Sequence, residues 1–380
     1  MATTPENGHS TKSPKFLILG GCGFIGRHLV SHLLDKSSVV FVIDKTPPEV
    51  AWLNPQQSDV FKNPKVKFTS ANLITLQGCE RAFDSVDDDI DYVINLAAET
   101  RKGQSDPVYK DGILQLCKNV CQFVDKKFGN RLHCYVELSS GFLYSNEKTP
   151  HKESDKVDLW NHETRYKHEA EKEVAKSIRN HIIIRPALVY GVGDRNGITP
   201  RLVMGAIYKH LNEVMKLPWT SDVRMNTIHV EDLVKGIAHI CFHGKHGEIY
   251  NLVDNGETTQ GHLCSLISEI FNVAHEFLGT TLSTIAKMDM QDLIEEINDK
   301  HMAPWASLCS SSGVANTPLS PYVYPDTLSK RHLSLDGEKF SKSGFDQWSY
   351  PKVTNDALVQ IIRDYMELKL FPEVALHGDN

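Results

Sequence analysis

The chain lacks the long apolar segments that would place it in a membrane. None of its 380 residues belongs to an uninterrupted apolar run near the roughly 20 residues that a membrane helix needs. Stretches such as His181–Tyr190 are broken by Arg, Pro or His. Residues 1–14 lack both the apolar core of a secretion signal and the Arg-rich character of a mitochondrial one. We therefore expect a short disordered tail at 1–14 and a cytoplasmic protein without membrane contact.

Paired cysteines are also missing. The eight cysteines are scattered and form no Cys-x-x-Cys pair, which fits a reduced compartment. Cys117 and Cys121 stand four apart in a helical pattern, which favours two small buried side chains over a metal clip. We predict no metal site, because the remaining candidate ligands lack the spacing of a zinc centre: His229, Cys241, His243 and His246.

An excess of basic charge is absent as well. The 41 Lys and Arg residues are outnumbered by 48 Asp and Glu residues, and the net charge is −7. Such a chain is a poor candidate for binding a nucleic-acid backbone. With 41% hydrophobic and 23% charged residues, the composition is that of a globular protein large enough for two or three domains.

Short apolar runs alternate with helical patterns through the first half of the chain. This alternation predicts an α/β fold with a doubly wound parallel sheet covered by helices on both faces. The expected strands are Phe16–Leu19, Val39–Ile43, Val66–Phe68, Tyr92–Leu96, Leu132–Ser139 and Ile182–Arg185. The expected helices are Phe24–Leu34, Val108–Val124 and His162–Ile178.

After Tyr190 the pattern loosens, and segments rich in Gly, Pro, Asn and Ser separate the helical stretches. We expect a cofactor-binding domain at 15–190 and a smaller, mostly helical substrate lobe at 191–380, from which some strands return to the sheet. The helices expected in the second lobe are Arg201–Met215, His262–Val273 and Asn355–Leu368.

A glycine-rich turn follows the first expected strand. Gly20, Gly23 and Gly26 allow a tight turn, close approach of a pyrophosphate and close packing of helix on strand. The free N–H groups of the following helix attract phosphate oxygens. Asp44, 24 residues after Gly20, ends the second strand, where a carboxylate can bind both ribose hydroxyls of a dinucleotide.

The charge of Asp44 favours NAD over NADP, because a carboxylate repels a 2′-phosphate. Two cations, Lys45 and Arg27, stand near in the sequence and keep NADP as the less favoured alternative.

These features resemble the extended short-chain dehydrogenase/reductases, the group of NAD-dependent epimerases and dehydratases with a Rossmann sheet. The likeness is an ordered series of motifs over about residues 15–255. It runs through Gly20–Gly26, Asn72-Leu73, Asn95–Ala98, Leu138–Tyr144, Arg185–Gly191, His229–Asp232 and Tyr250–Leu252, with a weaker match at Leu335–Phe345. The resemblance implies cofactor contacts at Gly20, Gly23, Phe24, Ile25, Gly26, Asp44, Lys45, Asn72, Leu73, Leu96, Ala97, Ala98, Lys167, Pro186 and Val189.

One departure from the family pattern concerns catalysis. The family's helix reads Tyr-x-x-x-Lys-x-x-Ala-Glu, and here Lys167 fits the lysine while Glu163 stands at the tyrosine position. In the family the tyrosine exchanges a proton with the substrate hydroxyl while a hydride passes to the cofactor. Glutamate is ordinarily ionised at neutral pH and returns a proton poorly. Glu163 and Lys167 could also form only a surface ion pair, and Tyr166 could reach the cleft from the flank.

The resemblance implies that Ser140 hydrogen-bonds the substrate, so the candidate catalytic residues are Ser140, Glu163, Tyr166 and Lys167. The predicted function is an NAD(P)-dependent oxidoreductase or epimerase/dehydratase acting on a nucleotide sugar or similar hydroxylated small molecule. Many family members bind the pyrophosphate with an arginine before the Val-x-Asp motif, and Arg224 lies one residue out of that register. A homodimer is expected. The alternative is a cofactor-binding pseudoenzyme with a regulatory or structural role.

Overall fold

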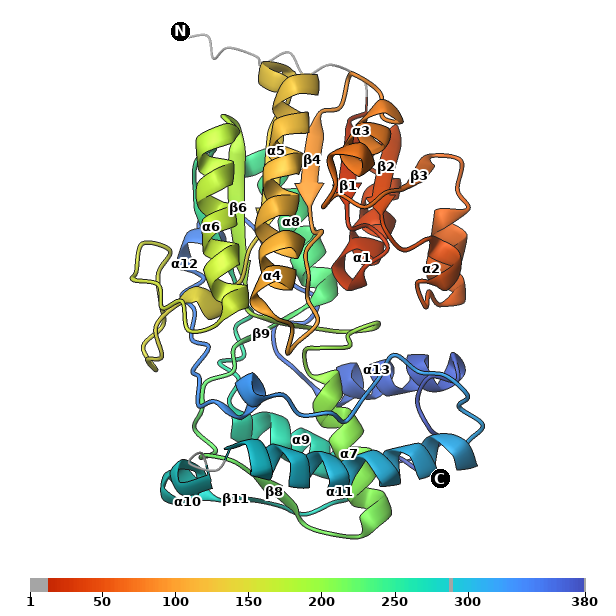
Figure 1. Cartoon of the computed structure of the whole chain (residues 1–380), viewed down its shortest axis with the longest axis vertical. Helices are drawn as coiled ribbons and strands as arrows, with labels where there is room; N and C mark the ends of the chain where they lie inside the picture. Colours follow the sequence, from red (N-terminus) through yellow and green to blue (C-terminus); the bar gives the residue numbers. More distant parts are fainter. Residues whose placement is uncertain (1–12, 287–289, 379–380) are drawn as a thin grey trace, which may run out of the picture.

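The computed structural model describes residues 13–286 and 290–378, and the chain folds into two lobes (Figure 1). The predicted tail at 1–14 lies outside the described residues, except for Ser13 and Pro14. A sheet flanked by helices forms the upper lobe in Figure 1, and mostly helical segments form the lower one.

The upper lobe is built on a seven-stranded sheet in the order β10-β6-β5-β4-β1-β2-β3, with every pair parallel. Leu17 on β1 is in register with Phe41 on β2 and with Val93 on β4. The doubly wound parallel sheet is therefore confirmed. Its strands are β1 (Lys15–Leu19), β2 (Val39–Asp44), β3 (Val66–Ser70), β4 (Tyr92–Asn95), β5 (Cys134–Leu138), β6 (His181–Pro186) and β10 (Ile249–Leu252).

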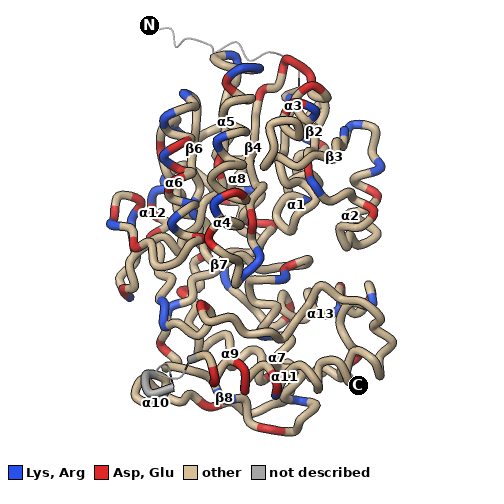
Figure 2. Tube along the Cα trace, viewed as in Figure 1, with Lys and Arg blue, Asp and Glu red and all other residues tan. Residues whose placement is uncertain are grey.

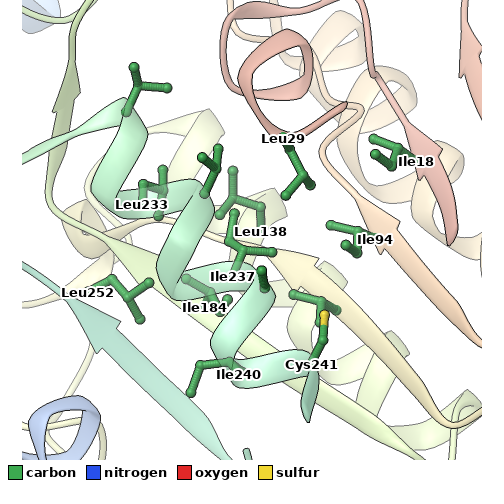
Figure 3. Close-up of a cluster of buried hydrophobic side chains, with 14 of the residues drawn as sticks. Ile18, Leu29, Ile94, Leu138, Ile184, Leu233, Ile237, Ile240, Cys241 and Leu252 are labelled. Atoms are coloured by element: carbon green, nitrogen blue, oxygen red, sulfur yellow. The ribbon is translucent and has the colours of Figure 1, made fainter. Parts of the chain in front are cut away.

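Helices cover both faces of the sheet because the strands are apolar on both sides. One face carries α1 (Phe24–Leu34), α2 (Pro55–Phe61) and α8 (Val230–His243); the other carries α3 (Leu76–Asp84), α5 (Leu116–Lys127) and α6 (His162–Ser177). Figure 3 shows the first interface, where Leu233 and Ile237 of α8 lie against Ile184 of the sheet. Short helical turns precede α5 at α4 (Asp106–Tyr109) and the π-helical η2 (Lys110–Gln115).

The lower lobe has its own core, made by Leu202, Ile267, Phe271, Trp305 and Ile361 with their neighbours. Its elements are α7 (Thr199–Leu211), α9 (Gln260–Phe271), α10 (Gly279–Ala286), α11 (Met290–Ser311), α13 (Asn355–Glu367) and the parallel pair β8 (Met215–Leu217) and β11 (His275–Phe277). The parallel pair β7 (Leu188–Tyr190) and β9 (Thr227–His229) and the short helix α12 (Glu338–Ser341) complete the regular structure, with 3₁₀ turns η1 (Pro48–Val50), η3 (Gly129–Arg131), η4 (Gly141–Leu143) and η5 (Pro325–Leu328).

The helix expected at Arg201–Met215 is wrong at its C-terminal end. It stops at Leu211 because Asn212 adopts a left-handed conformation, with φ of 52°, and Met215 already belongs to β8. The three-residue strands β8 and β11 are too short to show an alternating pattern. Helices α2, α3, α8 and α11 were not among those expected.

Charged residues of both signs alternate over the two lobes (Figure 2). In the part of the chain that the structure describes, no helix has the length and apolarity required to cross a membrane.

Candidate functional site

The strand order reverses between β1 and β4, since successive strands β1, β2 and β3 extend one way and β4, β5 and β6 the other. In open parallel sheets, ligands bind at the carboxyl ends of the strands beside such a reversal. The predicted cofactor and catalytic residues come from segments that follow β1, β2, β3, β4, β5 and β6, and from α6. The topology therefore brings segments far apart in sequence to one edge.

The glycine turn after β1 has the geometry that its sequence predicts. Gly20 has φ of +80°, a conformation that favours glycine. A Cβ atom at Gly26 would lie 2.3 Å from the Gly20 carbonyl oxygen, so only glycine lets α1 pack this closely. Gly23, the N-cap of α1, is exposed, and its added Cβ would meet only the Gly20 oxygen, at 3.2 Å. Space beside Gly23 is thus open to a ligand.

Asp44 is held at the end of β2 by two backbone groups. The N–H groups of Cys22 and Thr46 donate to its carboxylate at 3.0 and 2.9 Å. Burial raises the pKa of Asp44, although these hydrogen bonds oppose the shift. The carboxylate is therefore fixed next to the glycine turn and remains partly exposed.

Arg27 was expected as a nearby cation that could favour NADP, and the structure corrects this. Its guanidinium is buried and donates to the carbonyl oxygens of Cys22, Ala51 and Trp52 at 2.9, 2.7 and 2.9 Å. It ties α1 to the segment after β2 and faces away from solvent. Lys45, by contrast, is exposed beside Asp44.

The turn after β4 touches the glycine turn. A Cβ on Gly20 would lie 2.8 Å from the nitrogen of Ala97, so the two segments are in close contact. The turn is fixed by the buried Asn95, whose amide donates to Glu137 at 2.9 Å and whose carbonyl accepts from the Ala97 N–H at 3.1 Å. Leu96, Ala97 and Ala98 remain partly exposed at this edge, as do Phe24, Ile25 and Val189, while Asn72 is exposed and Leu73 and Pro186 are buried.

Ser140 follows the end of β5, and the side chain of Lys167 binds that same strand end. The Ser140 hydroxyl accepts from the Phe142 N–H at 3.2 Å, which leaves its own hydrogen for a ligand. The ammonium group of Lys167 donates to the carbonyl oxygen of Leu138 at 2.7 Å. This bond places the lysine ammonium beside Leu138, two positions before Ser140 in the sequence. A primary ammonium has two further hydrogens to donate.

Glu163 pairs with a lysine that the sequence did not single out. The Lys102 nitrogen lies 2.6 Å from Glu163 Oε2, and the two side chains are only 33% and 19% exposed. Burial alone would lower the pKa of the Lys102 ammonium, but the Glu163 carboxylate outweighs it and the pKa is raised. Lys102 belongs to the loop after β4, and its neighbour Arg101 fixes that loop through Glu99, at 2.7 and 2.9 Å. The available sequence signal was the basic pair Arg101-Lys102 after β4. Its position in the sequence did not show that Lys102 would pair with Glu163.

Tyr166 contacts the first residue of α4 and not Lys102. Its phenol hydrogen-bonds the carboxylate of Asp106 on α4 at 3.0 Å, and its ring packs in the core between α5 and α6. Burial and the Asp106 hydrogen bond raise the pKa of Tyr166, which makes a phenolate harder to form. The structure thus brings Glu163, and not Tyr166, to the loop after β4.

Several motif residues form a buried polar network instead of a binding surface. Arg185 forms an ion pair with Glu171 at 2.6 Å and donates to the Tyr144 hydroxyl at 2.9 Å. Tyr144 in turn donates to Asn251 at 2.8 Å. Asp232 accepts the N–H groups of two C-terminal residues, Ser349 and Tyr350. The Arg185 network stays within the upper lobe, and Asp232 fixes residues 349–350 to α8.

A groove of about 1000 Å³ opens elsewhere, between α1, α2 and α13. His28, Gln56 and Gln360 contribute to its lining, and none of the predicted cofactor or catalytic residues does.

Comparison with known proteins gives consistent matches over this region. The model of the NAD dependent epimerase/dehydratase family matches residues 16–252. The dTDP-glucose 4,6-dehydratase of Salmonella typhimurium is 22% identical over 289 residues, which are 67% of this chain and 77% of that protein.

Solved structures show the same fold. DesIV (dTDP-glucose 4,6-dehydratase) of Streptomyces venezuelae, with NAD and TYD bound, has a TM-score of 0.66 at 17% identity, over 93% of this chain and 97% of that one. The enzyme WbmF of Bordetella bronchiseptica, in complex with NADH, has a TM-score of 0.63 at 18% identity, over 94% and 93%.

Proposed function

Because the chain belongs to the NAD-dependent epimerase/dehydratase family, we propose that it oxidises or epimerises a nucleotide sugar, or a similar hydroxylated small molecule, with NAD. Membership in this family confirms the resemblance that the motifs predicted. It also confirms the prediction that the chain is an enzyme of this type. The NAD dependence in the family's name agrees with the predicted cofactor. The observation that carries the proposal is the convergence of the glycine turn, Asp44, Ser140 and Lys167 at one edge of the sheet.

These residues fit a bound NAD. The open space beside Gly23 admits a pyrophosphate, and the N-terminus of α1 presents free N–H groups to it. The fixed Asp44 carboxylate can accept two ribose hydroxyls and disfavours a 2′-phosphate. The dTDP-glucose dehydratases among the relatives support a nucleotide sugar as the substrate class.

When bound, NAD supplies a hydride acceptor. The chain's own groups must then hold the substrate hydroxyl and take its proton. We assign the hydrogen bond to the substrate to Ser140 and the proton to the Glu163 carboxylate, with Lys102 as its positioning residue. Lys167 would hold the nicotinamide ribose with the two ammonium hydrogens that are not donated to the Leu138 oxygen.

The test is a single-turnover reaction on the full chain loaded with NAD. Nucleotide sugars are added, and formation of NADH is followed by its absorbance. We expect Glu163→Gln to slow the reaction by about 10²–10⁴-fold, the usual contribution of general acid–base catalysis. Glu163→Tyr, which restores the family's tyrosine, should turn over faster than Glu163→Gln.

Tyr166→Phe is the matched control, since it removes a phenol bonded to Asp106 and should leave the rate unchanged. Loss of turnover in Tyr166→Phe, with Glu163→Gln unaffected, would contradict the assignment. If every variant binds NAD and none reduces it with any nucleotide sugar, the pseudoenzyme alternative is to be preferred.

A further inference from the structure

Arg201 stands in the first turn of α7, close to where the two lobes meet. The loop before it contacts the upper lobe twice: Arg195 donates to the Ala51 oxygen at 3.1 Å, and Asn196 donates to the Thr100 oxygen at 3.4 Å. From there α7 runs down into the lower lobe (Figure 1). The first turn of α7 thus lies at the junction of the lobes.

The guanidinium of Arg201 has weak partners. It contacts the Gly197 oxygen at 3.3 Å, which is long for a hydrogen bond of a charged donor. Its other partner, the Met225 sulfur at 3.8 Å, is a weak acceptor. In the described part of the chain it forms no ion pair with a carboxylate. Arg185 and Arg331, in contrast, pair with Glu171 and Asp158 at 2.6 and 2.8 Å.

The surroundings of Arg201 disfavour an unpaired cation. Burial lowers the pKa of its guanidinium, and the positive end of the α7 dipole adds to the cost. The neighbouring acid is Asp194, whose carboxylate already accepts the N–H groups of residues 196–199 and the Thr199 hydroxyl. Arg201 as a whole residue nevertheless remains partly exposed.

Arg201 is also connected to the candidate site. Its Gly197 contact lies directly against β7, because a Cβ on Gly197 would be 2.3 Å from the Val189 oxygen. Val189, on β7, is one of the cofactor contacts that the family resemblance implies. Arg224, the arginine suggested by the family pattern, instead pairs with Glu257 at 3.3 Å.

We propose that Arg201 binds an anionic group of the substrate, either the diphosphate of a nucleotide sugar or the carboxylate of a sugar acid. An arginine presents two parallel N–H groups that match such oxygens, and a desolvated guanidinium gains most from an anionic partner. The proposal rests on the function proposed above and identifies the residue that selects an anionic substrate.

The test is calorimetry on the NAD-loaded full chain with UDP, dTDP, uridine, thymidine, UDP-glucose and UDP-glucuronic acid. Arg201→Met should weaken binding of the anionic ligands at least tenfold, and Arg201→Lys should lose less. Lys209→Met is the matched control, because this cation lies at the other end of α7 and donates to the Phe271 oxygen. Equal losses for UDP and UDP-glucose identify the diphosphate; a loss confined to UDP-glucuronic acid identifies the carboxylate.

Thermal melting of the ligand-free chain separates binding from a structural role. Arg201→Met should melt no lower than the unmodified chain. It should lose the rise in melting temperature that UDP produces if Arg201 binds the diphosphate, or the additional rise that UDP-glucuronic acid produces over UDP-glucose if it binds the carboxylate. Unchanged affinity in Arg201→Met, or a loss confined to Arg224→Met, would overturn the proposal and leave the proposed function intact. If the unmodified chain binds NAD but none of these nucleotides, the nucleotide-sugar function fails, and the role of Arg201 fails with it.

Discussion

The ammonium nitrogen of Lys102 lies 2.6 Å from Glu163 Oε2 and so joins the loop after β4 to the first turn of α6. The motif pattern predicts that Glu163 stands where the family carries a tyrosine, and in the structure this carboxylate is paired with a lysine from a distant segment. The charge of Glu163 is therefore balanced from across the site, while Lys167, four residues along the same helix, is committed to Leu138.

The stability of this pair can be measured. A double-mutant cycle of Lys102→Met and Glu163→Gln should give a coupling free energy of about 1 kcal/mol, at the upper end for ion pairs because both side chains are mostly buried. The free energy of unfolding is measured in denaturant. Lys62 and Asp59, both more than 70% exposed, provide a control pair that should couple more weakly. Equal coupling in the two pairs would contradict the prediction.

Two glycines of the same turn should respond differently to substitution. Gly23→Val should abolish NAD binding in a folded protein, because its side chain would enter the open space beside the helix start. Gly26→Val should destabilise the fold itself by about 1–3 kcal/mol or more, because its Cβ would press on backbone atoms of Gly20 and Gly21. Calorimetry with NAD and thermal melting distinguish them. Unchanged NAD affinity in Gly23→Val would remove the turn from the site.

Asp44 should decide the choice of cofactor. We expect NAD to bind at least tenfold more tightly than NADP, a difference of about 1.4 kcal/mol, and Asp44→Ala to reduce that difference. Lys45→Ala serves as the control, because this exposed lysine is the remaining cation expected to favour NADP. Tighter binding of NADP to the unmodified chain would show that Lys45 outweighs the carboxylate.

Asp254 should make stability depend on pH. Burial raises the pKa of its carboxyl to about 6, against the effect of hydrogen bonds from Thr227 and Gly256. An unfolded aspartate titrates near pH 3.9, so ionisation costs more in the folded state and stability falls as the pH rises from about 4 to 6. Asp254→Asn removes this titration, so the free energy of unfolding of the variant relative to the unmodified chain should rise by about 2–3 kcal/mol between about pH 4 and pH 6.

This relative gain should disappear below about pH 4, because there the Asp254 carboxyl of the unmodified chain is neutral in both the folded and the unfolded state. Denaturation at pH 4 and pH 8 provides the comparison, with Asp84→Asn, at an exposed position, as the control. A difference between the Asp254 variant and the unmodified chain that is independent of pH would contradict this account.

The sequence by itself determined the sheet and the glycine turn that follows its first strand. Strands β1, β2 and β4 are short apolar runs, and their burial on both faces needs little beyond local pattern. The glycine turn is equally local, because the φ of Gly20 and the close approach at Gly26 restrict the residue type at each position. The predicted role of Asp44 follows from its position at the end of the second strand.

The tertiary structure decided which polar groups meet. Lys102 and Glu163 are 61 residues apart, and the parallel order of β4 and β5 with the packing of α6 brings them together. The orientation of Tyr166 toward Asp106 and of Arg27 toward buried carbonyls depends on neighbouring helices and loops. The isolation of Arg201 is likewise a property of its surroundings, since whether a charged side chain has a partner is settled only when distant segments pack against it.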